Sequence, residues 1–149
     1  FPETDIPWEA TVFAEITSET PKLLSIDFNS YTFTGGAHGY GSNTYMNFNP
    51  ETGAVYTHKD LFTPAFKDFV EKDFRNKENI PQGENINSTG MFFENDEFHL
   101  PANIGFRNDK LILTYNPYEI AAYVEGQKTY EYNLNEVSNY LKIDFSEKE

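Results

Sequence analysis

The sequence predicts an α+β domain, with a largely antiparallel sheet, one main helix at about residues 64–77 and a short C-terminal helix packed on one face. Stretches in which apolar and polar residues alternate occur in both halves of the chain. Between them lies one long segment whose apolar residues recur at helical spacing. The length of 149 residues suits one unit, so residues 1–149 are predicted to form a single domain.

The first half of the chain predicts three strands. Residues 8–17 alternate, and one face carries Trp8, Ala10, Val12, Ala14 and Ile16. A second strand begins at Leu24, and its apolar positions change parity midway, which predicts a bulge near Asn29 and Ser30. A third strand is expected over residues 43–49, with Thr44, Met46 and Phe48 in step, and a short extended piece over residues 54–62.

The helix prediction rests on a start signal and a spacing. Thr63 supplies a capping hydroxyl, and Pro64 suits the first helical position. The apolar positions that follow at helical spacing are Phe66, Phe69, Val70 and Phe74. Residues 78–97 are rich in Asn, Glu and Gly and are predicted to form a loop or a poorly defined short helix.

The second half returns to strands. Residues 102–106 and 111–115 are apolar and are joined by turn residues, so they predict a hairpin. A long connection follows, and residues 128–133 predict a further strand. Asn135 is expected to cap a short final helix that carries Val137 and Leu141.

The charge and composition exclude several classes of function. The net charge of −13 disfavours binding to nucleic acids and to anionic lipid, and it suits a cationic partner. The chain has no cysteine, which excludes disulfides and thiolate zinc sites. His38, His58 and His99 are scattered without a metal-binding spacing, and no nucleophile or phosphate-binding motif is present. We therefore expect no catalytic residue, no metal and no cofactor.

The stretch TFTGGAHGYGSN, residues 32–43, has two interpretations. In the first, it is a structural motif in which Gly35, Gly36 and Gly39 allow backbone conformations or a close approach that other residues forbid. His38 would then be largely buried and hydrogen-bonded to backbone. In the second, the loop is a site with His38 at the floor of an open cleft. The structural interpretation is favoured.

Two motifs resemble one family. They are Tyr-x-x-x-Gly-Gly-Ala-His-Gly at residues 31–39 and Tyr-Glu-Ile-Ala-x-Tyr-x-x-Gly at residues 118–126. The chain, over about residues 8–141, resembles the domain of unknown function at the C-terminus of RsiV-type anti-sigma factor ectodomains. The same domain stands beside the catalytic domain of PdaC-type deacetylases and in bacterial lipoproteins, and the metal motif of those deacetylases is absent here.

The resemblance implies an extracytoplasmic ligand-binding or sensing module of the bacterial cell envelope. Its expected partner is lysozyme or another basic protein, or cell-wall glycan such as peptidoglycan. Since the chain opens at Phe1 without an initiator Met or signal peptide, it is expected to be an excised fragment, with any membrane anchor in a missing N-terminal segment. The alternatives are a hydrolase that uses His38 with nearby carboxylates, a carbohydrate-binding module, or a module that only positions another domain.

The connection 116–126 is the candidate recognition surface. Loops on a rigid sheet commonly carry binding residues, and tyrosines are good interface anchors. The candidate ligand-binding residues are Pro117, Tyr118, Glu119, Tyr123 and Glu125. The alternative is that Ile120 and both tyrosines fold inward and the connection only closes the sheet edge.

Overall fold

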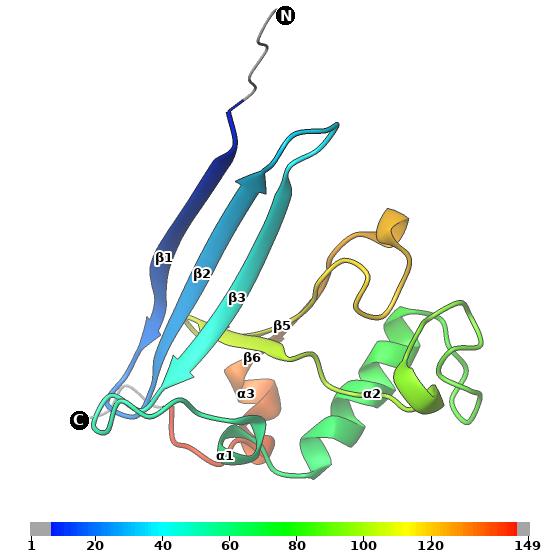
Figure 1. The fold of residues 1–149 in the computed structure, drawn as a ribbon. Helices are drawn as coiled ribbons and strands as arrows, with labels where there is room; N and C mark the ends of the chain where they lie inside the picture. Colours follow the sequence, from blue (N-terminus) through cyan, green and yellow to red (C-terminus); the bar gives the residue numbers. More distant parts are fainter. Residues whose placement is uncertain (1–6, 146–149) are drawn as a thin grey trace, which may run out of the picture.

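The computed structural model describes residues 7–145 and contains two three-stranded antiparallel sheets, ordered β1-β2-β3 and β4-β5-β6. The helices gather beside the second sheet, while the first sheet extends away from them (Figure 1). This arrangement confirms the predicted α+β class, with two sheets where the sequence suggested one. We call the β1–β3 sheet the flap, and the β4–β6 sheet with its helices the body. In the described part of the chain, no helix is long and apolar enough to cross a membrane.

The flap is a continuous meander. Its strands are β1 (Glu9–Glu19), β2 (Leu24–Phe33) and β3 (Tyr40–Phe48). The predicted bulge at Asn29 and Ser30 is wrong, because β2 pairs without interruption with both neighbours over that region. The register instead shifts in β1 between Ile16 and Ser18. The change of parity that suggested a bulge reflects apolar residues on both faces of the flap.

The body is formed by the rest of the chain. Its elements in chain order are α1 (His58–Leu61), α2 (Ala65–Lys77), a 3-10 turn (Glu94–Asp96), β4 (Asn103–Arg107), β5 (Lys110–Tyr115), a second 3-10 turn (Tyr123–Glu125), β6 (Lys128–Asn133), α3 (Leu134–Val137) and a final 3-10 turn (Ser138–Tyr140). The predicted hairpin and the last strand are therefore confirmed, as is the long loop before the hairpin.

The helix starts differ in detail from the prediction. Residues 58–61 form α1 rather than an extended piece, because Thr57 and Asp60 make a reciprocal capping box. The main helix is present, but its N-cap is Pro64, with no side-chain capping bond. The last helix is capped by Asn133 rather than by Asn135.

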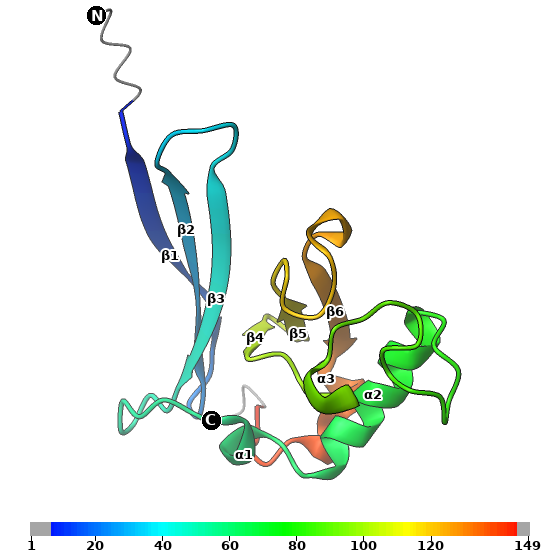
Figure 2. The same ribbon diagram turned by 45° about the vertical axis from the view of Figure 1, so that its right-hand side comes forward.

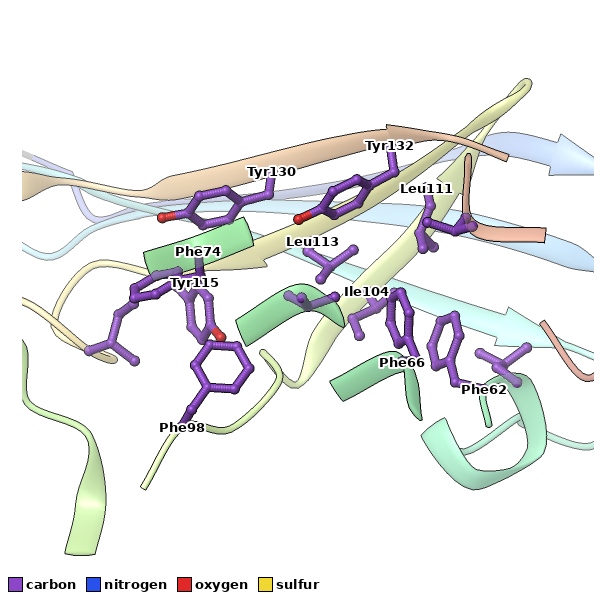
Figure 3. Close-up of a cluster of buried hydrophobic side chains, with 14 of the residues drawn as sticks. Phe62, Phe66, Phe74, Phe98, Ile104, Leu111, Leu113, Tyr115, Tyr130 and Tyr132 are labelled. Atoms are coloured by element: carbon purple, nitrogen blue, oxygen red, sulfur yellow. The ribbon is translucent and has the colours of Figure 1, made fainter. Parts of the chain in front are cut away.

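One aromatic core holds the body together (Figure 3). Phe66, Val70 and Phe74 of α2 are buried against the β4–β6 sheet, where they meet other apolar side chains. The sheet and the segments around it contribute Ile104, Phe106, Leu111, Leu113, Tyr115, Tyr130 and Tyr132. Phe69 is only partly buried and packs against the rings of Tyr132 and Tyr140. The helix thus packs through the four residues that the spacing predicted.

Polar side chains join the flap to the body. The Ser25 hydroxyl donates to Asn47 Oδ1 at 2.8 Å and accepts from the Phe106 N–H at 3.1 Å. Asn47 Nδ2 donates to the Ile104 carbonyl at 2.8 Å, and the Thr17 hydroxyl donates to the Phe106 carbonyl at 2.5 Å. Thr17, Ser25 and Asn47 are all buried. The inner face of the flap, which meets β4, is therefore polar at the junction.

The residues of β4 whose side positions face the flap complete this junction. Gly105 lies under the Tyr45 ring so closely that a Cβ on Gly105 would be 2.0 Å from ring atoms. Arg107 pairs with buried Asp27 at 3.2 Å and with Glu15 at 3.3 Å. The Arg107 side chain donates hydrogen bonds to Tyr45 and to Glu15, which raise the pKa of Arg107, so the guanidinium stays charged. These contacts fix the flap at one position relative to the body.

Candidate ligand-binding cleft

The connection between β2 and β3, residues 34–39, forms the free tip of the flap. Gly35 and Gly36 have φ angles of +94° and +96°, which residues with a side chain rarely adopt. A Cβ on Gly39 would lie 2.2 Å from the Tyr31 hydroxyl oxygen, so the tyrosine ring occupies the space beside the glycine. The glycines therefore have the backbone roles that the structural interpretation assigned to this loop.

His38 does not have the predicted surroundings. Its side chain is exposed, whereas the sequence led us to expect a largely buried imidazole bound to backbone. The tip extends beyond the body, so no second layer covers it (Figure 1). Within residues 7–145, no hydrogen bond or ion pair joins His38 to a carboxylate. The geometry thus gives the hydrolase alternative no support.

The connection 116–126 is held in shape by its own polar groups. The Asn116 N–H donates to Glu119 Oε2 at 2.9 Å, and the Glu119 N–H donates back to the Asn116 carbonyl at 3.1 Å. Tyr118 and Gly126 adopt positive φ angles of 71° and 69°. Glu119 is thus used in part to close its own turn.

The side chains of this connection divide between the core and the surface. Ile120 is buried, and its carbonyl accepts from the Phe92 N–H at 2.7 Å. Tyr118 is 68% exposed and Val124 is 88% exposed. Glu125 is also exposed, at 3.6 Å from Lys128 Nζ. The Tyr123 side chain lies outside the described residues. The alternative prediction was that Ile120 and both tyrosines turn inward. Ile120 does so, whereas Tyr118 does not.

A cleft of about 270 Å³ separates this connection from the upper part of the flap. Figure 2 shows the two backbone segments that contribute to it, β3 and the connection before β6, facing each other. The lining residues are Asn29, Ser30, Gly41, Ser42, Asn43, Pro117 and Gln127. Most carry neutral amide or hydroxyl groups, so the cleft offers hydrogen-bond donors and acceptors without a fixed charge.

The edge of β3 that faces the cleft is partly unpaired. The Asn103 side chain donates to the Asn43 carbonyl and accepts from the Tyr45 N–H, each at 2.7 Å, as a neighbouring strand would. In an antiparallel strand, the backbone groups of every second residue point to the same edge. Since those of Asn43 and Tyr45 point to the free edge of β3, those of Gly41 do so too. The cleft therefore presents main-chain as well as side-chain hydrogen-bonding groups.

The predicted site residues are only partly brought together. Pro117 lines the cleft, and Tyr118 and Glu119 follow it in the chain. Gly35, Gly36, His38 and Gly39 lie at the flap tip and do not line it. The sequence reading missed the polar lining residues, although the Asn-rich stretch SNTYMNFN was a signal for them.

Strongly perturbed ionisable groups lie away from the cleft. Burial, followed by a hydrogen bond to Glu78 or Asp73, raises the pKa of Tyr130 and Tyr132, and burial raises that of Tyr115. Burial also lowers the pKa of His58. These groups belong to the core and its rim. Among the residues the structure describes, no three His, Asp or Glu side chains come together as a metal site.

Comparison with known proteins identifies the domain. Residues 59–131 match the family described as protein of unknown function DUF3298, and residues 1–40 match the family described as deacetylase PdaC. No curated protein matches the chain.

Two solved structures share the fold. A DUF3298 family protein from Pseudomonas aeruginosa PAO1 is 21% identical with a TM-score of 0.62. A DUF3298 family member from Bacteroides fragilis is 19% identical with a TM-score of 0.69. The superpositions cover 91% of this chain in both cases, but only 62% and 55% of the two neighbours. Residues 59–131 belong to the DUF3298 domain family, whose function is unknown.

Proposed function

We propose that this chain is a binding module that recognises its partner with the 116–126 connection and the adjoining cleft. The observation that carries the proposal is the exposure of Tyr118 and Val124 on a loop whose backbone is fixed by Asn116 and Glu119. Large exposed side chains on a preorganised loop lose little entropy when a partner covers them. The side chains of Tyr118 and Val124 do not fill the core, because Ile120 is the residue of this connection that is buried there.

A basic protein is the partner that the charge favours. The chain carries a net charge of −13, and Glu125 stands exposed beside the proposed contact residues. Such a surface accelerates the approach of a cationic protein and disfavours an anionic one. Through the resemblance to RsiV-type ectodomains, lysozyme is the first partner to test. The same resemblance supports an extracytoplasmic role in a bacterial cell envelope.

Cell-wall glycan is the second candidate ligand. The observation that favours it is the neutral polar lining of the cleft, to which Asn29, Asn43 and Gln127 contribute amides, and the amides of Asn43 and Gln127 are held by bonds to Asp27 and Asn116. Neutral amides form hydrogen bonds with sugar hydroxyls without needing a charge on the ligand. A glycan complex would therefore depend little on salt, whereas a complex with a basic protein would weaken as salt is added.

The test is calorimetric titration with hen lysozyme and, separately, with soluble peptidoglycan fragments, each at low and at high salt. We expect lysozyme to bind at low salt and to weaken as salt screens the attraction. Binding of the fragments alone would move the chain to the carbohydrate-binding class. An absence of heat with both ligands at low salt would overturn the proposal.

A matched pair of variants locates the surface. Tyr118→Ala is expected to weaken binding by about tenfold or more, as for an interface tyrosine worth about 2 kcal/mol. Tyr40→Ala is the control, because Tyr40 is 67% exposed but lies on the opposite face of the flap. Equal losses in the two variants would show that the 116–126 connection is not the contact surface.

A further inference from the structure

The outer face of the flap, which turns away from the body, is apolar. The strand register places the even-numbered positions of β2 and β3 on it, together with the even-numbered positions of β1 up to Ile16 and, after the register shift, Glu19. These residues are Ala10, Val12, Ala14, Ile16, Glu19, Leu24, Ile26, Phe28, Ser30, Thr32, Tyr40, Ser42, Thr44, Met46 and Phe48, and Trp8 continues the alternation. No described helix or strand lies against this face (Figures 1 and 2).

At its junction with the body, the flap is inverted relative to an ordinary two-layer protein. The inner face is buried there and carries Ser25, Asp27 and Asn47, while Trp8 and Val12 on the outer face are 78% and 71% exposed. Farther from the body, Phe13 and Tyr31 on the inner face are exposed as well. Antiparallel sheets usually bury the apolar face and expose the polar one. Monomeric proteins seldom leave a contiguous apolar patch of this kind uncovered.

The charge of the outer face limits what can cover it. Among its described strand residues only Glu19, at the end of β1, is charged, in a chain whose net charge is −13. A cationic partner gains an ion pair only at that end of the face. A second copy of the chain is electrostatically compatible, because the rest of the two faces is uncharged and meets without bringing like charges into contact.

The size of the face also fits a second copy. At about 3.3 Å per residue, the nine residues of β3 make the face about 30 Å long. Trp8 and Tyr40 each offer about 150–250 Å² when covered, and Val12, Ile16, Phe28 and Met46 extend the patch. The whole face approaches the roughly 800 Å² per partner of a stable interface.

We propose that two copies of the chain stack through the outer faces of their flaps. The two sheets then pack face to face, about 10 Å apart, as in a β-sandwich. The contact is self-complementary, so it closes as a two-fold dimer rather than growing into a filament. Of the residues that line the cleft, Ser30 and Ser42 also belong to the outer face, whereas Asn29, Gly41, Asn43, Pro117 and Gln127 do not.

The oligomeric state of the chain tests this proposal directly. Sedimentation equilibrium across a wide range of protein concentration is expected to show a shift from one 17.2-kDa chain to two. Trp8 is the only tryptophan, so its fluorescence reports on this face without labelling. Its emission should move to shorter wavelength in step with the change in mass. Added salt should preserve the dimer, in contrast to binding of a basic protein, because it screens the repulsion between the two acidic chains.

Two substitutions at neighbouring positions separate this face from the rest of the surface. Val12→Lys places a charge on the outer face and is expected to weaken the dimer by at least about tenfold. Thr11→Lys adds the same charge to the inner face, opposite Tyr31, and should leave the dimer unchanged. Both positions are exposed, so neither substitution should prevent folding.

Three results would overturn the proposal. The first is a monomer at all concentrations with Trp8 emission typical of water. The second is a monomer in which Trp8 emission is already shifted, because another part of the chain would then cover the face. The third is an equal loss of dimer in the two lysine variants, which would point to contact through the free edge of β1.

Discussion

Replacing Asn47 by alanine should destabilise the fold through the junction between the flap and the body. The Asn47 side chain is the central polar group of this junction, since it binds the Ser25 hydroxyl and the Ile104 carbonyl at 2.8 Å each. Truncation leaves the Ile104 carbonyl buried without its donor, which costs about 1–3 kcal/mol. It also removes the acceptor of the Ser25 hydroxyl, which adds about 0.5–1.5 kcal/mol. The expected loss of unfolding free energy is about 2–4 kcal/mol.

Urea denaturation measures this loss. With a slope of about 2 kcal/mol per molar urea, the midpoint should fall by about 1–2 M. Asn29→Ala is the control, because Asn29 lies on the same inner face but within residues 7–145 its side chain makes no hydrogen bond to the protein. That variant should stay within about 0.5 kcal/mol of the parent chain.

A double substitution sharpens the test. Because Asn47 and Ser25 share a hydrogen bond, the losses for Asn47→Ala and Ser25→Ala should not add, and a coupling of at least about 0.5 kcal/mol is expected. A midpoint for Asn47→Ala within error of the Asn29→Ala midpoint would refute the reasoning. The junction would then be held by the contact between Tyr45 and Gly105 instead.

Three further predictions concern the body and the junction. Phe66→Ala in the main helix should lower the unfolding free energy by about 3–5 kcal/mol in the same urea experiment, since the ring is fully buried, and a small effect would contradict the core described above. Gly105→Ala should cost about 1–3 kcal/mol, because the new Cβ meets the base of the Tyr45 ring, while Gly105→Ala combined with Tyr45→Ala should recover part of the loss. Burial lowers the pKa of His58, so the unfolded chain binds a proton at this imidazole more readily than the folded chain does. The free energy of unfolding should therefore fall as the pH drops below about 6.5. If the dependence of this free energy on pH is unchanged in His58→Gln, His58 is not the cause.

Local patterns in the sequence were sufficient for most elements of the fold. The strands and the main helix follow from periodicity, which depends only on near neighbours. The helix α1 was missed although Thr57 and Asp60 form its capping box, because four residues are too few for an apolar period to appear. The conformations of Gly35 and Gly36 were also predictable, since positive φ is a local property.

Burial and contacts between distant segments were not predictable in this way. The exposure of His38 depends on how far the flap reaches beyond the body. The alternation of β1 shows two faces, but not that Thr17 at its end would be buried against Phe106 of β4. The cleft is lined by both Gly41 and Pro117, which are far apart in the chain. No local pattern in the sequence indicates that these two residues line the same cleft.

The polar junction has a consequence for the dynamics of the molecule. The lower part of the flap is tied to the body by buried hydrogen bonds, whereas its upper part is covered on neither face by a core. In hydrogen exchange, the amides of β5 and β6 should therefore report the free energy of global unfolding, while those near Tyr31 and Gly41 exchange through a smaller local opening. The body would then be rigid, and the end of the flap beside the cleft would be more mobile. A ligand that contacts both should slow amide hydrogen exchange at the flap tip first.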